Sequence, residues 1–257
     1  MLPVTKFWNN IFSNNVYLEN NNNNFVNRAD LAPVLACQHS LGSVCFDYDN
    51  DGDLDLAVAN LSSFNELFKN MYMETGKLSF EPIIDVLFED EVDSWLGIST
   101  SDYNLDGYLD LLKVSQNNIH LFENKNEGNN WLGINCIGKV SNGSAIGAKV
   151  YVYATISGKK VKQYRQILSM SGNHSVTSKH LHFGLADASV VDSVEVKWPS
   201  GAKQVLSNIE INQNIIIEEC ATPTPVVNLQ AIYSNEQINL TWDNTVTDED
   251  KYIIEYR

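Results

Sequence analysis

The chain has 257 residues, with 32 acidic against 17 basic side chains, and its net charge at pH 7 is −15. So acidic a surface argues against nucleic acid or anionic membranes as partners, because binding to either requires clustered Lys and Arg. No run of about 18 apolar residues occurs, so we expect no membrane insertion. The first ten residues lack a basic segment followed by an apolar one, and so we expect no signal peptide in this chain.

An asparagine-rich run, residues 20–24, lies between two short apolar stretches near the N-terminus. Read by composition alone, the run is of low complexity and compatible with disorder. We favour a five-residue hairpin turn, with outer strands of a sheet at residues 16–18 and 25–26.

Residues 47–55 read Asp-Tyr-Asp-Asn-Asp-Gly-Asp-Leu-Asp, with an oxygen-bearing side chain at every second position. Five carboxylates this close repel one another unless a cation holds them. Ca²⁺ accepts about six to eight oxygen ligands from carboxylates, carbonyls and water. Gly52 supplies the positive φ of a sharp turn. The predicted ligands of this first loop are the side chains of Asp47, Asp49, Asp51 and Asp55 and the backbone carbonyl of Asp53.

The pattern returns 55 positions later, at residues 102–110. Self-similarity at such a period is typical of a repeat array. The predicted ligands of this second loop are Asp102, Asn104, Asp106, Asp110 and the carbonyl of Tyr108. The sequence therefore predicts two Ca²⁺ sites.

An EF-hand begins in the same way but requires a bidentate Glu at position twelve and a helix on each side. Position twelve is Val58 in the first loop and Lys113 in the second, and the flanking segments have strand-like sequences. Each loop is therefore expected to join two strands. The alternative is an acidic, solvated hairpin tip without a metal ion.

These loops resemble the FG-GAP/VCBS repeats of integrin-like β-propellers, in which a Ca²⁺ loop joins the first two strands of each blade. Segments 15–20, 65–70 and 118–124 look like three copies of one outer blade strand. The resemblance implies complete blades at residues 42–82 and 95–124. Propellers close with about four to eight blades. We therefore expect either further blades before Met1 or another element that covers the open edge.

No Asp-rich loop of this pattern occurs in the sequence after residue 129. Short segments with alternating apolar residues follow instead, which is typical of the strands of a sandwich or barrel. Five motifs carry a resemblance to the ASPIC/UnbV domain: Asn-Trp-Leu-Gly at 130–133, Ile-Gly-Ala at 146–148, Leu-His-Phe-Gly-Leu at 181–185, Val-Glu-Val-Lys-Trp-Pro-Ser-Gly at 194–201 and Asn-Ile at 208–209. This resemblance implies an architecture more than an activity.

Residues 221–226 begin Ala-Thr-Pro-Thr-Pro and form a stiff linker. Segments 227–231, 238–243 and 252–257 resemble the first three strands of a fibronectin type III domain, with Trp242 as its core tryptophan. Three of seven strands cannot bury a core, so we expect this part to be incomplete.

The sequence thus predicts an all-β protein. Partial β-propeller blades (residues 1–128) precede a β-sandwich or barrel domain (129–220), a linker (221–226) and an incomplete fibronectin type III sandwich (227–257).

Two further sets of residues leave alternatives open. Cys37 and Cys45, or Cys136 and Cys220, are placed so that each pair can form a disulfide, although buried free thiols are the simpler interpretation. His180 and His182 flank Leu181 on one face of a strand and so offer two ligands for a transition metal. We interpret His182 as structural.

The motifs favour a calcium-binding, non-catalytic interaction module that is secreted or at the cell surface and binds an extracellular protein or glycan. Weak, open-loop Ca²⁺ sites suit the millimolar calcium of that space. No motif of a nucleophile paired with a base, P-loop or zinc protease occurs, so we expect no enzyme. The alternatives are an enzyme or biosynthetic accessory protein with a pocket on either domain, and a calcium-stiffened spacer.

Overall fold

The computed structural model describes residues 16–28, 31, 40–60, 66–83, 95–115, 117–170, 178–220, 227–234 and 237–243. These residues form β-strands joined by turns, with one short helix, α2 (Tyr72–Thr75), so the all-β prediction is confirmed. The chain divides into two compact units, residues 1–219 and 220–257. Within the described part of the chain, no helix is long and apolar enough to cross a membrane.

The asparagine-rich run forms the turn of a hairpin between β1 (Leu18–Asn21) and β2 (Asn24–Asn27). Asn22 and Asn23 occupy the left-handed region at φ 49° and 67°, which asparagine tolerates better than most residues. A hairpin at this run is therefore confirmed, but its turn has two residues and not the five predicted, because Asn20, Asn21 and Asn24 pair within the strands. β1 also begins two residues later than predicted.

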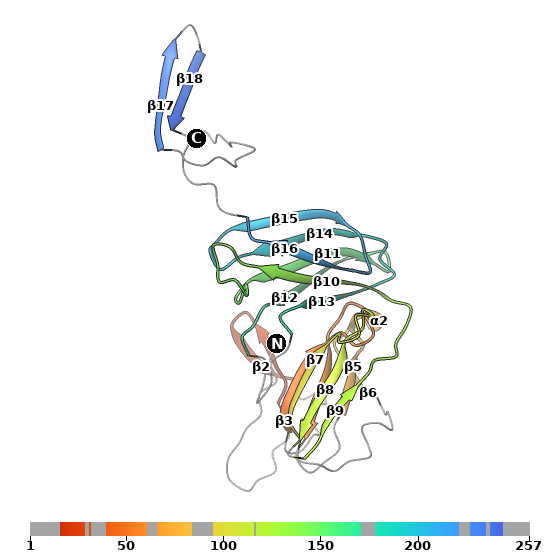
Figure 1. The fold of residues 1–257 in the computed structure, drawn as a ribbon. Helices are drawn as coiled ribbons and strands as arrows, with labels where there is room; N and C mark the ends of the chain where they lie inside the picture. Colours follow the sequence, from red (N-terminus) through yellow and green to blue (C-terminus); the bar gives the residue numbers. More distant parts are fainter. Residues whose placement is uncertain are drawn as a thin grey trace. The chain divides into compact units, whose positions relative to one another are not determined.

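Two antiparallel sheets follow, in which each strand pairs with the next in sequence (Figure 1). The first blade consists of β3 (Ser40–Phe46), β4 (Asp55–Asn60), β5 (Glu66–Asn70) and β6 (Phe80–Ile83). The second consists of β7 (Trp95–Ser101), β8 (Asp110–Ser115) and β9 (Ile119–Phe122). Both Asp-rich loops join the first two strands of a blade, as the sequence predicts.

The first blade is covered on both faces, which explains why all six residues of β4 are buried. One core contains Val44 and Phe46 of the first blade with Ile98 and Leu111 of the second. On the opposite face, Leu56, Val58, Phe68 and Phe80 pack with Leu31. The two sheets therefore stack face to face, as neighbouring blades do.

A β-sandwich follows the blades. One sheet has the order β13 (Leu181–Ala186), β10 (Asn130–Ile137), β16 (Gln213–Glu218), with β10 and β16 parallel. The other has the order β12 (Lys159–Gln166), β11 (Lys149–Ile156), β14 (Val191–Lys197), β15 (Lys203–Ile209).

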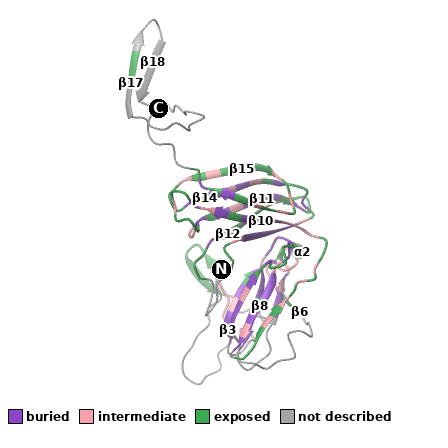
Figure 2. Ribbon diagram, viewed as in Figure 1, coloured by how far each residue is buried: buried purple, intermediate pink, exposed green. Residues whose placement is uncertain are grey.

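The core of the sandwich lies between these two sheets. β11 alternates buried and more exposed residues, so that Val150, Val152, Ala154 and Ile156 face inward, as the period of a half-buried strand requires. Figure 2 shows this burial in β10, β11 and β14, in contrast to the exposed β1–β2 hairpin.

The cysteine alternatives are settled in part. Cys136 is a buried free thiol, so the bond between Cys136 and Cys220 that the sequence left open is not formed. Cys136 faces the apolar core, where a small thiol packs as a hydrophobic group. The pairing of Cys37 with Cys45 lies outside the described residues because Cys37 does.

In the second unit, β17 (Val227–Ser234) and β18 (Gln237–Asp243) form an antiparallel hairpin. These strands match the predicted segments 227–231 and 238–243. The third predicted strand, residues 252–257, lies outside the described residues. The start of a fibronectin type III domain therefore stays a prediction.

Candidate metal centre

The first loop is held in a tight turn by its own first and last carboxylates. Asp47 accepts hydrogen bonds from the backbone amides of Asp51 (3.1 Å) and Gly52 (3.0 Å). Asp55 accepts from the amides of Tyr48 (2.9 Å) and Asn70 (2.8 Å). Gly52 has a φ of 103°, a conformation that glycine adopts at little cost.

The second loop repeats this geometry. Asp102 accepts from the amides of Asp106 (3.1 Å) and Gly107 (3.0 Å), and Asp110 accepts from those of Tyr103 (3.0 Å) and Asn124 (2.8 Å). Its glycine is also left-handed, with a φ of 91°. The sequence repeat is therefore a structural repeat, in which the same donors meet the same acceptors.

The carboxylates of the first loop converge in two groups. Within each group, one carboxylate oxygen from every member lies within 4.8 Å of the others. The first group is Asp47, Asp49 and Asp55; the second is Asp51, Asp53 and Glu74. The predicted ligands thus lie close together but divide between the groups. Among the described residues, the second loop forms no such group of three, since its third position is Asn104.

Several buried oxygens of the first loop have no hydrogen-bond partner among the described residues. These oxygens are Asp49 Oδ1, Asn50 Oδ1, Asp51 Oδ2 and Asp53 Oδ1. Buried carboxylate oxygens without a partner are costly. A hard divalent cation, which binds oxygen ligands by preference, would satisfy them. The residues present therefore fit a hard divalent metal ion.

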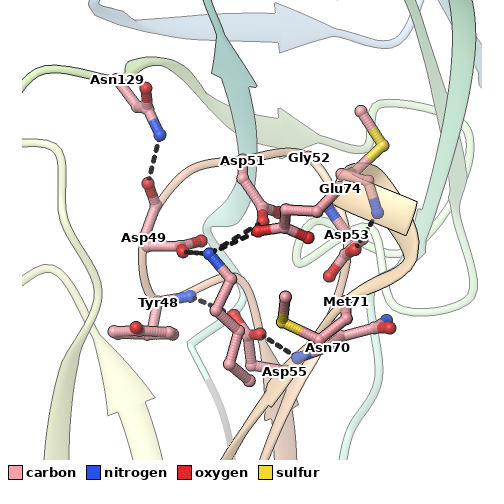
Figure 3. Close-up of polar contacts among 12 residues, drawn as sticks. Tyr48, Asp49, Asp51, Gly52, Asp53, Asp55, Asn70, Met71, Glu74 and Asn129 are labelled. Carbon is pink, nitrogen blue, oxygen red and sulfur yellow. Dashed lines mark hydrogen bonds and ion pairs between the residues drawn. The ribbon is translucent and has the colours of Figure 1, made fainter. Parts of the chain in front are cut away.

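Lys69 places a positive charge beside three of these carboxylates, those of Asp49, Asp51 and Glu74. Figure 3 shows these three carboxylates pointing toward one another. Its Nζ donates a hydrogen bond to Asp49 Oδ2, and lies 2.7 Å from Glu74 Oε1 and 3.5 Å from Asp51 Oδ2. Burial works to lower the pKa of Lys69, but its hydrogen bonds to Asp49 and Glu74 raise that pKa well above the usual value. The Lys69 ammonium is therefore a permanent charge in the first loop.

Burial disfavours the ionised form of the loop carboxyls. It raises the pKa of Asp51 to about 6, that of Asp53 to about 7 and that of Asp55 to about 9. Burial likewise raises the pKa values of Asp102 and Asp110 in the second loop. A bound cation would reverse this effect, because an opposite charge at contact distance favours the carboxylate.

The two loops are tied to each other and to the segment that follows the second blade. Asn50 Nδ2 donates a 2.9 Å hydrogen bond to the carbonyl of Gly107. The side-chain amides of Asn124 and Asn126 donate to the carbonyl of Tyr48, at 2.6 and 3.0 Å. The amide of Asn129 donates to the carbonyl of Asp49, at 2.8 Å.

Both loops also contact β13 and β10 of the sandwich, and we call this contact surface the junction. His182 Nε2 lies 2.9 Å from the Gly107 carbonyl oxygen, and the amide of Ala186 donates to the Asn50 carbonyl at 2.8 Å. The Trp131 ring stacks on that of His182, with centroids 6.0 Å apart. A methyl group at Gly107 would overlap the Trp131 indole. The motifs at 130–133 and 181–185 thus meet both loops.

This geometry gives His182 a structural role. It is buried, and burial lowers its pKa to about 4, so the ring is neutral and its Nε2–H donates to Gly107. Among the described residues, neither His180 nor His182 belongs to a group of three metal ligands. The alternative of a transition-metal site at His180 and His182 therefore finds no third ligand among the described residues.

Sequence reasoning missed Glu74 and Lys69. Glu74 reaches the loop from helix α2. The described residues of the second blade contain no such helix, so the repeat pattern offered no signal for Glu74. Lys69 could have been noticed in the sequence. The matching outer-strand segments 65–70 and 118–124 place Lys69 and Glu123, which have opposite charges, at the same position.

Comparison with known families agrees with this architecture. Residues 47–113 match the family described as FG-GAP-like repeat, and residues 138–224 match the family described as ASPIC and UnbV. The chain therefore carries FG-GAP-like repeats followed by an ASPIC and UnbV domain. The first match spans both Asp-rich loops, and the second spans most of the sandwich.

The chain is also similar to a named protein. It is 32% identical over 188 residues to cartilage acidic protein 1 of Homo sapiens, which covers 67% of this chain and 27% of that protein. It is 31% identical over 190 residues to cartilage acidic protein 1 of Mus musculus, covering 68% and 28%. The chain thus spans little more than a quarter of the length of these relatives.

Proposed function

We propose that this chain is a calcium-binding, non-catalytic interaction module that acts outside the cell or at its surface. The observation that carries the proposal is the first loop, in which buried carboxylate oxygens converge without enough donors to satisfy them; the second loop repeats its backbone geometry. Oxygen-only ligand sets favour Ca²⁺ or Mg²⁺ over softer metals. A loop that offers several carboxylates and a carbonyl suits the flexible, many-oxygen coordination of Ca²⁺.

In this proposal the first loop holds one ion through Asp47, Asp49, Asp51, Asp55 and the Asp53 carbonyl. The second loop holds another through Asp102, Asn104, Asp106, Asp110 and the Tyr108 carbonyl. The ion supplies positive charge and fixed geometry, with no bond made or broken. Because both loops lie at the junction, Ca²⁺ would stiffen the connection between the blades and the sandwich.

Calcium supply supports the proposed extracellular setting, and the acidic charge of the chain is compatible with it. Ca²⁺ sites of 10⁻⁴ to 10⁻³ M affinity occur in extracellular modules. The relatives carry the name cartilage acidic protein 1, and this chain is itself acidic, with a net charge of −15. The proposed partner is an extracellular protein or glycan, bound with Ca²⁺ in place.

The test of calcium binding is thermal unfolding in Ca²⁺ and in a chelator. Two sites filled at about 100 times their Kd would add roughly 2.7 kcal/mol each. In a chain of this size, that corresponds to a rise in Tm of roughly 10 °C or more. We expect the rise to vanish in the double variant Asp51→Ala, Asp106→Ala.

A matched control is the double variant Glu127→Ala, Glu210→Ala, which removes the same charge from two exposed positions outside the loops. It should keep the full rise in Tm. If wild-type protein melts at the same temperature with and without Ca²⁺, the loops are empty acidic turns and the proposal fails.

The partner is tested by binding of purified protein to matrix proteins and to a glycan array, each in Ca²⁺ and in chelator. We expect binding in Ca²⁺ that is lost in the Asp51→Ala, Asp106→Ala variant. Equal binding in Ca²⁺ and in chelator would show that partner recognition does not depend on metal binding by the loops.

The second candidate function is a calcium-stiffened spacer without a specific ligand. The contacts of both loops with the sandwich favour it, because a metal ion bound beside these contacts would stiffen the connection between the blades and the sandwich. A Ca²⁺-dependent rise in Tm without any Ca²⁺-dependent partner would favour this function over the first.

A further inference from the structure

The two loops differ in charge at one equivalent position. Asn70 donates its side-chain amide to the Leu54 carbonyl at 3.1 Å, and Asn124 donates to the Leu109 carbonyl at 3.1 Å. The backbone amides of these two asparagines also make the same contact, with Asp55 and Asp110 respectively. The residues that precede them, Lys69 and Glu123, are therefore structural counterparts.

Each counterpart contacts the third residue of its own loop. Lys69 donates to Asp49, whereas Glu123 Oε1 accepts from Asn104 Nδ2 at 3.3 Å. The same contact is thus cationic in the first loop and anionic in the second. Glu123 also pairs with Lys125, whose side chain is three-quarters exposed.

The Lys69 ammonium contacts carboxylates that a metal ion in the first loop would need as ligands. Its Nζ contacts carboxylates of both groups of the first loop: Asp49 belongs to one, and Asp51 and Glu74 belong to the other. Asp49 and Asp51 are also predicted metal ligands. A metal ion bound by them must therefore share these oxygens with Lys69 or displace it.

The ammonium does not satisfy the loop by itself. Asp51 and Asp53 are 9% and 8% exposed. Asp53 Oδ1 has no hydrogen-bond partner among the described residues, and Asp51 Oδ2 has none besides its 3.5 Å ion pair with Lys69. Both residues belong to the group that Lys69 also contacts through Glu74. The first loop therefore retains ligand atoms for a second cation while one positive charge is already present.

We propose that Lys69 is a built-in counter-ion that competes with Ca²⁺ for the carboxylates of the first loop. This inference rests on the proposed function, in which both loops bind Ca²⁺. It has two consequences. Lys69 lowers the calcium affinity of the first loop, and it supports the shape of that loop when Ca²⁺ is absent.

The direction of both effects follows from Coulomb's law. A unit positive charge a few ångströms from a divalent ion repels it, and the repulsion is stronger in a partly buried site than in water. Removal of the charge should raise the calcium affinity of the first loop about tenfold or more. In chelator, the same change leaves the carboxylates facing one another without a cation.

The experiment isolates the first loop by calorimetric titration with CaCl₂ in an Asp106→Ala background, where the second loop is disabled. Lys69→Met and Lys69→Gln are compared with the parent and with Lys77→Met. Lys77 is exposed in the turn after α2, so its replacement removes an equal charge close in sequence. We expect tighter binding at one site in both Lys69 variants and unchanged binding in Lys77→Met.

Thermal unfolding in chelator provides a readout that needs no bound metal. We expect both Lys69 variants to melt below Lys77→Met in chelator, and to recover in Ca²⁺. A Lys69 variant that folds only with Ca²⁺ supports the counter-ion role in its strongest form. The reciprocal change, Glu123→Lys in an Asp51→Ala background, should weaken binding at the second loop.

The inference is overturned if the Lys69 variants bind Ca²⁺ with the affinity of the parent, or if Lys77→Met raises the affinity equally. In either case Ca²⁺ still binds, and the proposed function stands. If wild-type protein takes up no Ca²⁺ at any concentration tested, the proposed function itself has failed and the inference falls with it.

Discussion

Asn50 of the first loop and Gly107 of the second are joined by a hydrogen bond of 2.9 Å, from the Asn50 side-chain amide to the Gly107 carbonyl. The same carbonyl oxygen lies 2.9 Å from Nε2 of His182 in the sandwich. Both loops and the sandwich therefore meet at one backbone oxygen. A substitution that shifts either loop should therefore disturb the hydrogen bonds of the other loop and of β13.

Asn50→Gly is expected to weaken the junction without straining the chain. Asn50 has a φ of 58°, which glycine adopts freely, so the variant removes the amide and little else. Loss of one buried hydrogen bond should lower the free energy of unfolding by about 1 kcal/mol, measured by urea denaturation. The control is Asn22→Gly, which makes the same change in the exposed β1–β2 turn at φ 49°. Equal stability of the two variants would show that the bond between the loops contributes nothing.

Gly184→Ala should disrupt the junction by overpacking. A methyl group at Gly184 would stand 2.5 Å from the Asn50 Cα, and closer still to an oxygen of Asp47. Overpacking of this kind costs about 1–3 kcal/mol, and we expect a lower Tm both in Ca²⁺ and in chelator. Gly143→Ala is the control, because nothing lies within 4 Å of the added methyl group there. If Gly184→Ala has the same Tm as wild type, the first loop and β13 can move apart at little cost.

Part of this architecture could be predicted from the sequence. The alternation of Asp residues around Gly52 and Gly107 located both loops and their flanking strands, because those contacts are local in the chain. The ends of individual strands were less accurate. β3 begins at Ser40, two residues before the predicted start of the first blade at residue 42.

The junction could not be predicted in the same way. The contacts of Gly184 with Asp47 and of His182 with Gly107 join residues far apart in the chain. The motif Leu-His-Phe-Gly-Leu indicated that residues 181–185 have a fixed structural role, but not what they contact. Glu74 escaped notice because its approach to Asp51 and Asp53 depends on a helix of four residues.

Hydrogen exchange at the Ala186 amide should report the state of the first loop. This amide donates to the carbonyl of Asn50, so it exchanges only when the junction opens. If Ca²⁺ stiffens the loop, exchange should slow on addition of CaCl₂. The amide of Glu219, which donates to Ile137 at the other end of β10, provides an internal control and should change less. Equal slowing at both amides would indicate a global effect of Ca²⁺ instead of one focused on the junction.

Glu219 anchors the turn after β10 through its carboxylate. It accepts hydrogen bonds from the backbone amides of Lys139, Val140 and Ser141, and from the hydroxyls of Ser141 and Ser200. Burial works to raise the pKa of Glu219, but these hydrogen bonds lower it to about 2. The folded state therefore prefers the ionised carboxylate more strongly than the unfolded state does.

The sign of the pH effect follows from linkage. Because the folded pKa of Glu219 lies below the unfolded value of about 4.3, the stabilisation is complete above that value. It is lost as the pH falls toward 2. Glu219→Gln should lower the free energy of unfolding by about 2 kcal/mol at pH 7, since charge-assisted hydrogen bonds are among the stronger ones. The difference in free energy of unfolding between Glu219→Gln and wild type should be smaller when urea denaturation is repeated at pH 3.

The control is the neighbouring variant Glu218→Gln, at an exposed side chain paired with Lys139. It should lower the free energy of unfolding only slightly at either pH. A gap between Glu219→Gln and wild type that is the same at pH 7 and pH 3 would mean that the carboxylate charge does not anchor this turn.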